Sequence, residues 1–137
     1  SIPGMKNAGL ASDSLAELID LYPTLAGLCG LTKPPHLNGL SLMPVLDNPK
    51  AKVRQAAFTV TRIRGKIPGV KMNNQLGRTI RTERYRYTEW ADSKHGVELY
   101  DYKTDPAEYT NLAKRNSSKK VLNWMQRLMQ TTRAHTR

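Results

Sequence analysis

Two alternating stretches in the second half of the chain restrict its fold more than any other feature. Residues 79–82 (TIRT) and 85–90 (YRYTEW) are separated by only a Glu-Arg pair. Successive side chains of a strand point to opposite faces, so Tyr85 and Tyr87 would share one face. The opposite face would carry three other side chains: Arg86, Thr88 and Trp90. The pattern predicts a β-hairpin that turns at the Glu-Arg pair and has one buried face.

The sequence on both sides extends this hairpin into a larger sheet. Residues 58–61 alternate Phe-Thr-Val-Thr, which is typical of a half-buried strand, and residues 97–102 follow a turn at 92–96. We therefore expect an antiparallel sheet of about four strands. After Ser117 or Ser118 as the helix cap, apolar residues recur at intervals of three and four: Val121, Leu122, Met125, Leu128 and Met129. This spacing predicts a C-terminal helix with one face packed on the sheet.

A shorter helix is indicated between the sheet and the C-terminal helix. Asp105, Pro106 and Glu108 stand where a helix start often has an N-cap aspartate, a proline at the first position and an acidic third residue. We expect a brief helix there.

Prolines and glycines limit the helices in the first third of the chain. Pro23 is tolerated only in the first turn of a helix. With Asp20 as N-cap and Gly30 just past the end, the sequence predicts a helix over residues 21–29. Residues 15–19 would form a short strand or a lead-in to this helix.

The pattern changes near residue 50, where we expect a boundary between two domains. Ser41 can cap a short helical turn at residues 42–46, and an Asn-Pro pair then breaks it. Residues 1–50 would form one unit and residues 51–137 a small α+β unit with the sheet and the terminal helix.

The chain is strongly basic. Its 22 Lys and Arg residues against 11 Asp and Glu give a net charge of +11. Such a charge attracts anionic partners: nucleic acid, anionic lipid or sulfated polysaccharide. Alternatively, many of these cations only solvate the surface, or acidic parts of a larger protein balance them. No apolar run approaches the roughly 20 residues that span a bilayer, so we expect no membrane partner.

Basic and aromatic residues alternate in the hairpin, as they do in some nucleic-acid-binding sheets. A half-buried strand produces the same pattern, because it needs large side chains on one face and tolerates charges on the other. The sequence contains no RNP octamer, KH loop or zinc finger. We therefore expect no nucleic-acid partner.

The residue types that carry hydrolytic or metal chemistry are scattered. The three histidines, His36, His95 and His135, show no zinc-ligand spacing and no Ser/His/Asp arrangement. The single cysteine, Cys29, has no charged or histidine neighbour, so we expect a small buried hydrophobic residue rather than a nucleophile.

Short motifs follow one another in a characteristic order along most of the chain. They are Pro3-Gly4, DLYPTL (20–25), GLSLMP (39–44), TIRT (79–82), RYRYTEW (84–90), ELYD (98–101) and DPAEYTNLA (105–113). In this order and spacing the chain resembles the C-terminal portion of a sulfatase, closest to the iduronate-2-sulfatase-like branch. One departure is Tyr102, since histidine is common after ELYD in that family.

The resemblance implies an α/β, alkaline phosphatase-like fold of which this chain is only the C-terminal part. Residues 1–50 would end the large domain, and residues 51–137 would form the C-terminal subdomain. It also implies an exported parent, periplasmic or secreted, that hydrolyses sulfate esters of a sulfated sugar with a formylglycine and a calcium ion. Neither group can be assigned here, because Cys29 is followed by Gly-Leu-Thr-Lys rather than x-Pro-Ser-Arg and no paired metal-binding aspartates occur.

Residues 62–78 form a loop-like stretch, and we expect its basic part, residues 62–71, to lie where an anionic substrate enters the active-site cleft of such a parent. Its proposed substrate-binding residues are Arg62, Arg64, Lys66 and Lys71. Arginine can pair bidentately with a carboxylate or sulfate, whereas lysine acts as a point charge. The partners would be the N-terminal sulfatase domain of the same parent and an anionic sulfated sugar. The chain alone would be inactive. The alternative function is a free-standing basic module that binds an anionic polymer such as nucleic acid or a sulfated glycan.

Overall fold

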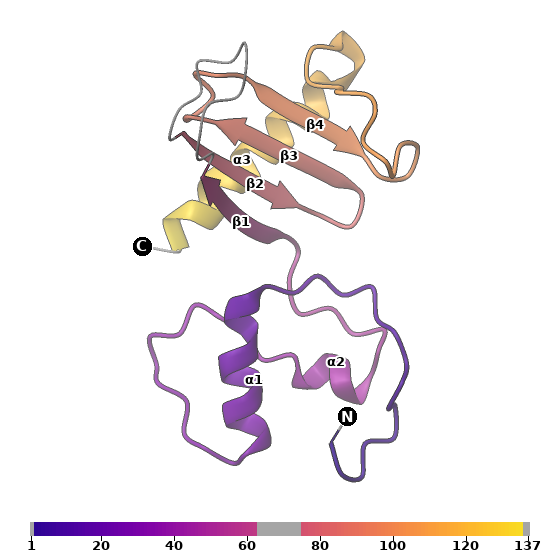
Figure 1. Ribbon diagram of the computed structural model, residues 1–137, viewed down its shortest axis with the longest axis vertical. Coiled ribbons are helices and arrows are strands. Elements are labelled where there is room, and N and C mark those ends of the chain that lie inside the picture. The colour runs from indigo at the N-terminus through magenta and orange to yellow at the C-terminus, as the bar shows by residue number, and fades with distance from the viewer. Residues whose placement is uncertain (1, 63–74, 136–137) are drawn as a thin grey trace. The chain divides into compact units, whose positions relative to one another are not determined.

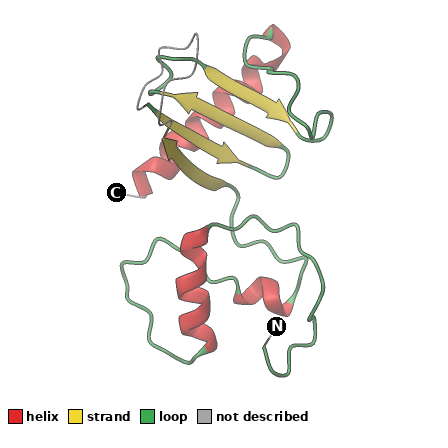
Figure 2. Ribbon diagram, viewed as in Figure 1, coloured by secondary structure: helices red, strands yellow, loops and turns green. Residues whose placement is uncertain are grey.

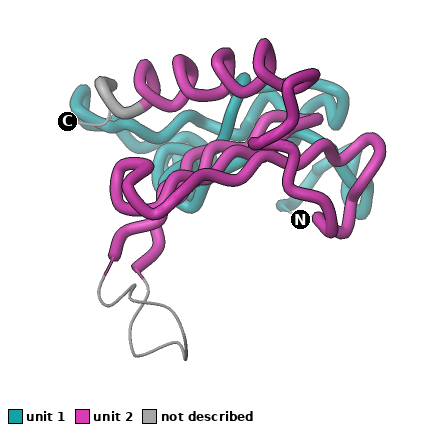
Figure 3. Tube along the Cα trace, turned by 90° about the horizontal axis from the view of Figure 1, so that it is seen from above, with its two compact units in different colours: residues 1–57 teal, residues 58–137 magenta. Residues whose placement is uncertain are grey.

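The chain separates into two compact units, residues 1–57 and 58–137, which Figure 3 shows in different colours. The computed structural model describes residues 2–62 and 75–135. The sequence predicted a boundary after residue 50. None of the described helices combines the length and the apolar character that a membrane crossing requires.

The second unit is built on a four-stranded sheet with strand order β1-β2-β3-β4 (Figure 2). The strands are β1 (Ala57–Arg62), β2 (Leu76–Arg81), β3 (Tyr85–Trp90) and β4 (Val97–Asp101). The pairs β2/β3 and β3/β4 are antiparallel, with Ile80 opposite Tyr87 and Tyr87 opposite Leu99. The predicted antiparallel sheet and hairpin are confirmed.

Helix α3 (Lys119–His135) covers one face of this sheet and packs against β2 and β3 (Figure 1). Met125 and Met129 on its inner side are almost completely buried. The sheet supplies the remaining buried apolar side chains of this core: Ile80, Tyr87 and Leu99. The prediction that the apolar stripe of the C-terminal helix packs on the sheet is therefore confirmed for its two most buried members.

The brief helix predicted at residues 105–108 is wrong. The chain forms turns there, and Glu108 has a left-handed backbone with φ of 61° that interrupts a helix. The Asp105 carboxylate accepts hydrogen bonds from the amides of Tyr109 and Thr110 at 3.1 and 2.7 Å. The N-cap pattern was misleading because the Glu108 carboxylate is used in a tertiary contact with Tyr102 and Arg86.

The first unit contains a short 3₁₀ turn, η1 (Leu18–Asp20), and two helices, α1 (Leu21–Leu28) and α2 (Met43–Asp47). Helix α1 begins after Asp20, as predicted, and Gly30 ends it with φ of 69°. The amide of Leu31 donates to the Ala26 carbonyl at 2.8 Å, and the amide of Gly30 donates to Gly27. These bonds satisfy carbonyls at the helix end, where a left-handed residue favours glycine.

Helix α1 buries small side chains and leaves most of its large apolar ones exposed. Its buried residues are Pro23, Thr24 and Ala26, whereas its larger apolar side chains are exposed. The exposed ones, with the preceding turn included, are Leu18, Ile19, Leu21, Tyr22 and Leu25. Cys29 is exposed as well, so the prediction that it is buried is wrong. Leu18, Tyr22, Leu25 and Cys29 follow one another at helical spacing, and we call these four residues the α1 stripe.

Candidate functional site

Of the four predicted substrate-binding residues, Arg62 lies within the described part of the chain. It is the last residue of β1 and its side chain is exposed. Arg64, Lys66 and Lys71 lie outside the described residues, so their proposed role stays a prediction.

Arg62 lines a shallow pocket of about 300 Å³ in the second unit. Its other lining residues come from the start of β2 and the turn after β3: Gln75, Leu76, Arg78, Ala91, Asp92 and Lys94. We call this the β-turn pocket. Sequence reasoning predicted Arg62 there but missed Arg78 as a partner and did not consider Lys94.

The sheet topology explains why these residues meet. Three strand termini lie at the same end of the sheet: the end of β1, the start of β2 and the end of β3. Gly77 of β2 is paired there with Trp90 of β3. The amide of Ala91 donates to the Leu76 carbonyl at 2.8 Å and so continues the ladder by one residue. This bond places the turn after β3 directly beside the start of β2.

The turn itself has an uncommon backbone. Ala91, Asp92 and Ser93 have φ values of 50°, 53° and 70°, three consecutive left-handed residues that are not glycine. Each such conformation costs on the order of 1–2 kcal/mol outside glycine, with Asn and Asp the most tolerant. Bonds from Lys94 to Ala91 and from Gly96 to Ser93 hold the turn. The surrounding structure therefore fixes the orientation of Asp92 and Lys94 relative to β2.

The pocket is cationic. Among the residues that the structure describes, three positive side chains and one carboxylate line it. Nη1 of Arg78 donates to Oδ1 of Asp92 at 2.6 Å, and the Arg78 side chain is 16% exposed whereas that of Asp92 is 58% exposed. Glu89 lies on β3 directly opposite Arg78 but is not among the described residues that line the pocket. In residues 2–62 and 75–135 no cluster of His, Cys, Asp and Glu suits a metal ion.

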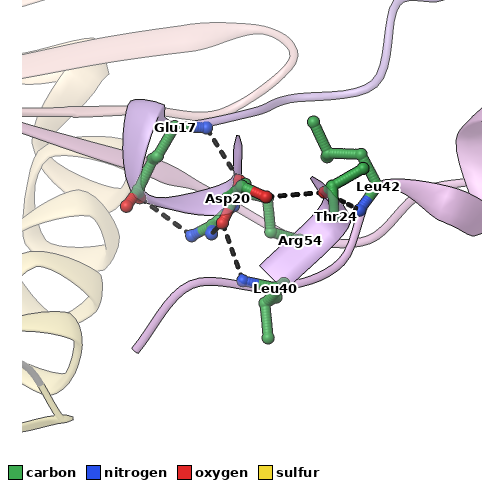
Figure 4. Close-up of polar contacts among 6 residues, drawn as sticks. All are labelled: Glu17, Asp20, Thr24, Leu40, Leu42 and Arg54. Carbon is green, nitrogen blue, oxygen red and sulfur yellow. Dashed lines mark hydrogen bonds and ion pairs between the residues drawn. The ribbon is translucent and has the colours of Figure 1, made fainter. Parts of the chain in front are cut away.

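A second polar cluster lies in the first unit around Asp20, which is completely buried (Figure 4). Its carboxylate accepts hydrogen bonds from the amides of Glu17 and Leu40, both at 2.8 Å, and pairs with the Arg54 guanidinium. Arg54 also donates to Oε1 of Glu17 at 2.9 Å. We call this the Asp20 cluster.

The Asp20 cluster corrects the role that the sequence assigned to this aspartate. Asp20 makes no side-chain cap bond to α1; its carboxylate instead joins the turn before α1 to the segments on either side of α2. Thr24 extends the cluster, because its hydroxyl donates to the Asp20 carbonyl at 2.6 Å and accepts from the Leu42 amide at 2.8 Å. These hydrogen bonds join the DLYPTL motif to the GLSLMP motif, so both motifs have a structural role. Nothing in the local sequence singled out Arg54.

A third cluster occupies the sheet face opposite α3. Arg81 lies 3.8 Å from the centre of the Tyr102 ring and Arg86 lies 5.2 Å from that of Tyr100. The Tyr102 hydroxyl donates to Glu108, which also pairs with Arg86. Burial raises the pKa of the Tyr102 phenol, and the Glu108 bond adds to this rise. Tyr102 therefore has a packing role where the family commonly has histidine.

Arg84 is likewise bound within the fold. Its guanidinium donates to both oxygens of Asp101, from Nε at 2.9 Å and from Nη2 at 2.7 Å. These bonds hold the pKa of the Asp101 carboxyl below its usual range. The arginines of the RYRYTEW hairpin thus have intramolecular partners, which does not favour a nucleic-acid-binding sheet.

Comparison with known proteins agrees with this structure. Residues 1–135 match the family described as N-sulphoglucosamine sulphohydrolase, C-terminal. A curated relative, the Delta 4,5-hexuronate-2-O-sulfatase of Bacteroides thetaiotaomicron, is 36% identical over 122 residues, which are 88% of this chain and 24% of that protein. The chain thus spans about a quarter of the length of this relative.

Two solved structures share the fold. One is a protein in complex with its substrate D-glucosamine-2-N,6-O-disulfate, with a TM-score of 0.69 and 25% identity over 85% of this chain and 23% of that one. The other is a phosphonate monoester hydrolase of Agrobacterium radiobacter, with a TM-score of 0.66 and 31% identity over 85% of this chain and 24% of that one. The predicted resemblance is confirmed: the chain belongs to the N-sulphoglucosamine sulphohydrolase C-terminal family and has the fold of the C-terminal portion of a sulfatase.

Proposed function

We propose that this chain is the C-terminal portion of an enzyme that hydrolyses sulfate esters of a sulfated sugar, most specifically a 2-O-sulfated hexuronate. The observation that carries the proposal is the family match over residues 1–135. The hexuronate-2-O-sulfatase relative supports the 2-O-sulfated substrate, and the disulfated glucosamine complex supports a sulfated sugar in general. The free-standing basic module is not favoured, since the relatives are enzymes about four times longer.

The catalytic groups of such an enzyme would belong to the rest of the parent. A formylglycine and a calcium ion would supply the nucleophile and the charge that stabilises the sulfate. The residues of this chain do not fit either group, because Cys29 lacks the x-Pro-Ser-Arg context and the described residues hold no metal-ligand cluster. We assign to this chain completion of the fold and contact with an anionic substrate through Arg62, Arg64, Lys66 and Lys71.

The exposed apolar side chains of the first unit support the fold-completing role. Leu18, Tyr22 and Leu25 are 86%, 56% and 59% exposed on the α1 stripe. Burying one large apolar side chain contributes roughly 1.5–3 kcal/mol, so leaving a stripe of them in water forgoes substantial stability. We propose that the large domain of the same parent covers the α1 stripe, with residues 1–50 as the end of that domain.

Substitution of Leu25 by lysine tests this role. In the 137-residue chain, Leu25→Lys changes the unfolding free energy by less than about 0.5 kcal/mol, as expected for an exposed site. In the full-length parent it costs several times more, because a charge enters an apolar interface. Tyr109→Lys, at a side chain 89% exposed in the second unit, is the control. Equal effects of Leu25→Lys in both proteins would exclude the interface.

The activity is tested with the full-length parent carrying its formylglycine. We expect sulfate release from an unsaturated 2-O-sulfated uronate disaccharide and less from a 6-O-sulfated glucosamine. The phosphonate monoester hydrolase neighbour makes phosphonate monoesters the second candidate substrate class. Hydrolysis of an aryl phosphonate monoester without any sulfate release would favour that class and reject the proposed one.

A further inference from the structure

We propose that the β-turn pocket binds an oxyanion group of a sugar, a sulfate or a carboxylate, with Arg78 and Lys94 as the binding residues and Asp92 as a displaceable counterion. This inference deepens the proposed function and rests on it for the sugar part of the ligand. It adds two side chains, one from β2 and one from the turn between β3 and β4, to Arg62, the one proposed substrate-binding residue that lies in the described chain.

Arg78 has the geometry of an anion-binding residue. Its side chain is largely buried, yet Asp92 is its only hydrogen-bonded partner in residues 2–62 and 75–135, and that bond uses Nη1 alone. A guanidinium carries five N–H donors in a planar fork that matches two oxygens of a carboxylate or sulfate. Donors therefore remain for a bidentate contact with a ligand that enters the pocket.

Asp92 is suited to give way to such a ligand. Its side chain is more than half exposed, so its carboxylate stays in contact with water when the pair with Arg78 opens. The left-handed backbone at residues 91–93 costs free energy and is held by the turn itself, so the Asp92 side chain can rotate while the turn keeps its path. An incoming oxyanion then replaces one weak contact of Arg78 with a stronger one.

Lys94 adds a second positive charge from the same turn. Its side chain is exposed, and its amide donates to the Ala91 carbonyl at 3.2 Å, which fixes where the side chain leaves the backbone. Together with Arg62, this gives the described lining residues three cations against one carboxylate. Both charge and donor arrangement favour an oxyanion.

The other lining residues favour a sugar over a nucleic acid. None of the described lining side chains is aromatic, so these residues offer no surface on which bases stack. The Gln75 amide can bond hydroxyl groups, while Leu76 and Ala91 supply apolar surface. A volume of about 300 Å³ suits a group of monosaccharide size.

Binding to the full-length parent tests the pocket separately from catalysis. The probes for titration calorimetry are N-acetylglucosamine 6-sulfate, glucuronate and neutral N-acetylglucosamine. We expect Arg78→Gln and Lys94→Gln to weaken binding of at least one anionic probe by about tenfold. The control Lys120→Gln removes the same charge from an exposed site on α3 and leaves binding unchanged. The sulfate and carboxylate probes show which oxyanion the pocket prefers.

Asp92→Asn gives the sharpest outcome, because it keeps the side-chain size and asparagine tolerates the left-handed backbone. Loss of the competing carboxylate should tighten anion binding by about threefold, whereas a purely structural Asp92 would give weaker binding on substitution. Should Arg78→Gln fail to fold, Asp92→Asn and Lys94→Gln decide the question. The proposal that this pocket binds anions is overturned by either of two results. One is an equal effect of Lys94→Gln and Lys120→Gln on probe affinity, and the other is weaker binding with Asp92→Asn.

The failure of this inference is distinguishable from failure of the proposed function. If the parent releases sulfate but the pocket variants behave like Lys120→Gln, the pocket is rejected and the function stands. If the parent releases no sulfate but the pocket variants still bind glucuronate or the sugar sulfate more weakly, the pocket stands and the proposed function is rejected.

Discussion

The two units achieve order by different means. In the second unit, five apolar side chains from the sheet and α3 are almost completely buried: Ile80, Tyr87, Leu99, Met125 and Met129. In the first unit, the described apolar side chains that are buried are small: Pro23, Ala26 and Ala56. The large side chain that is most deeply buried there is that of Asp20. One unit has an apolar core, and the other is held by hydrogen bonds to a carboxylate.

This difference shows what each unit can do alone. Burial of apolar surface is the main favourable contribution to folding, and the second unit obtains it from its own residues. The first unit leaves many of its larger apolar side chains exposed and relies on the Asp20 cluster, whose ionic groups are costly to bury unless fully paired. The comparison supports the proposal that another part of the parent covers the first unit.

Removal of the Asp20 carboxylate should give the largest effect. Asp20→Ala leaves the mostly buried Arg54 without its main partner and two amides without an acceptor, which costs about 3 kcal/mol or more. Loss of amide hydrogen-exchange protection at Leu40 is the measurement. Asp13→Ala, at an exposed aspartate of the same unit, should change nothing. Retained protection in Asp20→Ala would show that the first unit does not depend on this cluster.

Truncation of Leu99 probes the apolar core of the second unit. Leu99 is completely buried and lies opposite Tyr87 in the sheet, so Leu99→Ala should cost about 2–5 kcal/mol through lost burial and a cavity. Urea unfolding of the 137-residue chain measures this cost. The control is Leu31→Ala, at a leucine 64% exposed, with a change below about 0.5 kcal/mol. Similar values for both leucines would contradict a core in the second unit.

Alanine substitutions at two glycines, one in each unit, test how tightly the two units are packed. A Cβ at Gly39 would lie 2.1 Å from the Ile19 carbonyl oxygen, and one at Gly77 would lie 2.4 Å from the Trp90 ring. Backbone yields less than a side chain, so Gly39→Ala should cost more than Gly77→Ala within a range of about 1–3 kcal/mol.

Thermal unfolding of the two variants measures the difference. Gly27→Ala is the matched control, because its Cβ meets only atoms of two flexible side chains, Met43 and Lys33, and alanine favours a helix by about 0.5–1 kcal/mol. The reverse order of Gly39→Ala and Gly77→Ala would show that the first unit is the more loosely packed.

The smallest expected effect is on the unfolding free energy at acid pH. Arg84 lowers the pKa of Asp101, so this pair stabilises the fold above the unfolded carboxyl pKa of about 3.9, and the contribution is lost as pH falls through the lowered value. Arg84→Gln should flatten the decline of the unfolding free energy below about pH 4. Urea titrations at several acid pH values measure it, with Lys120→Gln as control. An unchanged slope would mean that other carboxylates carry the acid sensitivity.

Much of the fold follows from short stretches of sequence. The structure contains the elements that three local patterns predicted. The two-residue alternation predicted the hairpin, the apolar spacing predicted the last helix, and the position of Gly30 predicted where the first helix ends. The ordered motifs predicted the family, which the match over residues 1–135 confirms. These features depend on neighbouring residues, whose periodicity and backbone preferences are fixed locally.

The candidate site was only partly predictable. Arg62 was predicted from its charge and loop position, whereas no role was predicted for Arg78, and Lys94 lay in a turn without any motif. They meet because the Ala91 amide continues the β2–β3 ladder and three left-handed residues turn the chain back. Such a juxtaposition depends on strand register, which the composition of a turn does not specify.

The sequence by itself determined which elements form, in which order, and to which family they belong. The tertiary structure alone decided that Asp20 pairs with Arg54, 34 residues away, and that the α1 stripe with Cys29 faces outward. The physical reason is competition: the buried carboxylate gains more from a guanidinium and two amides than from capping its own helix. Local patterns cannot reveal that choice, because the competing partners lie far apart along the chain.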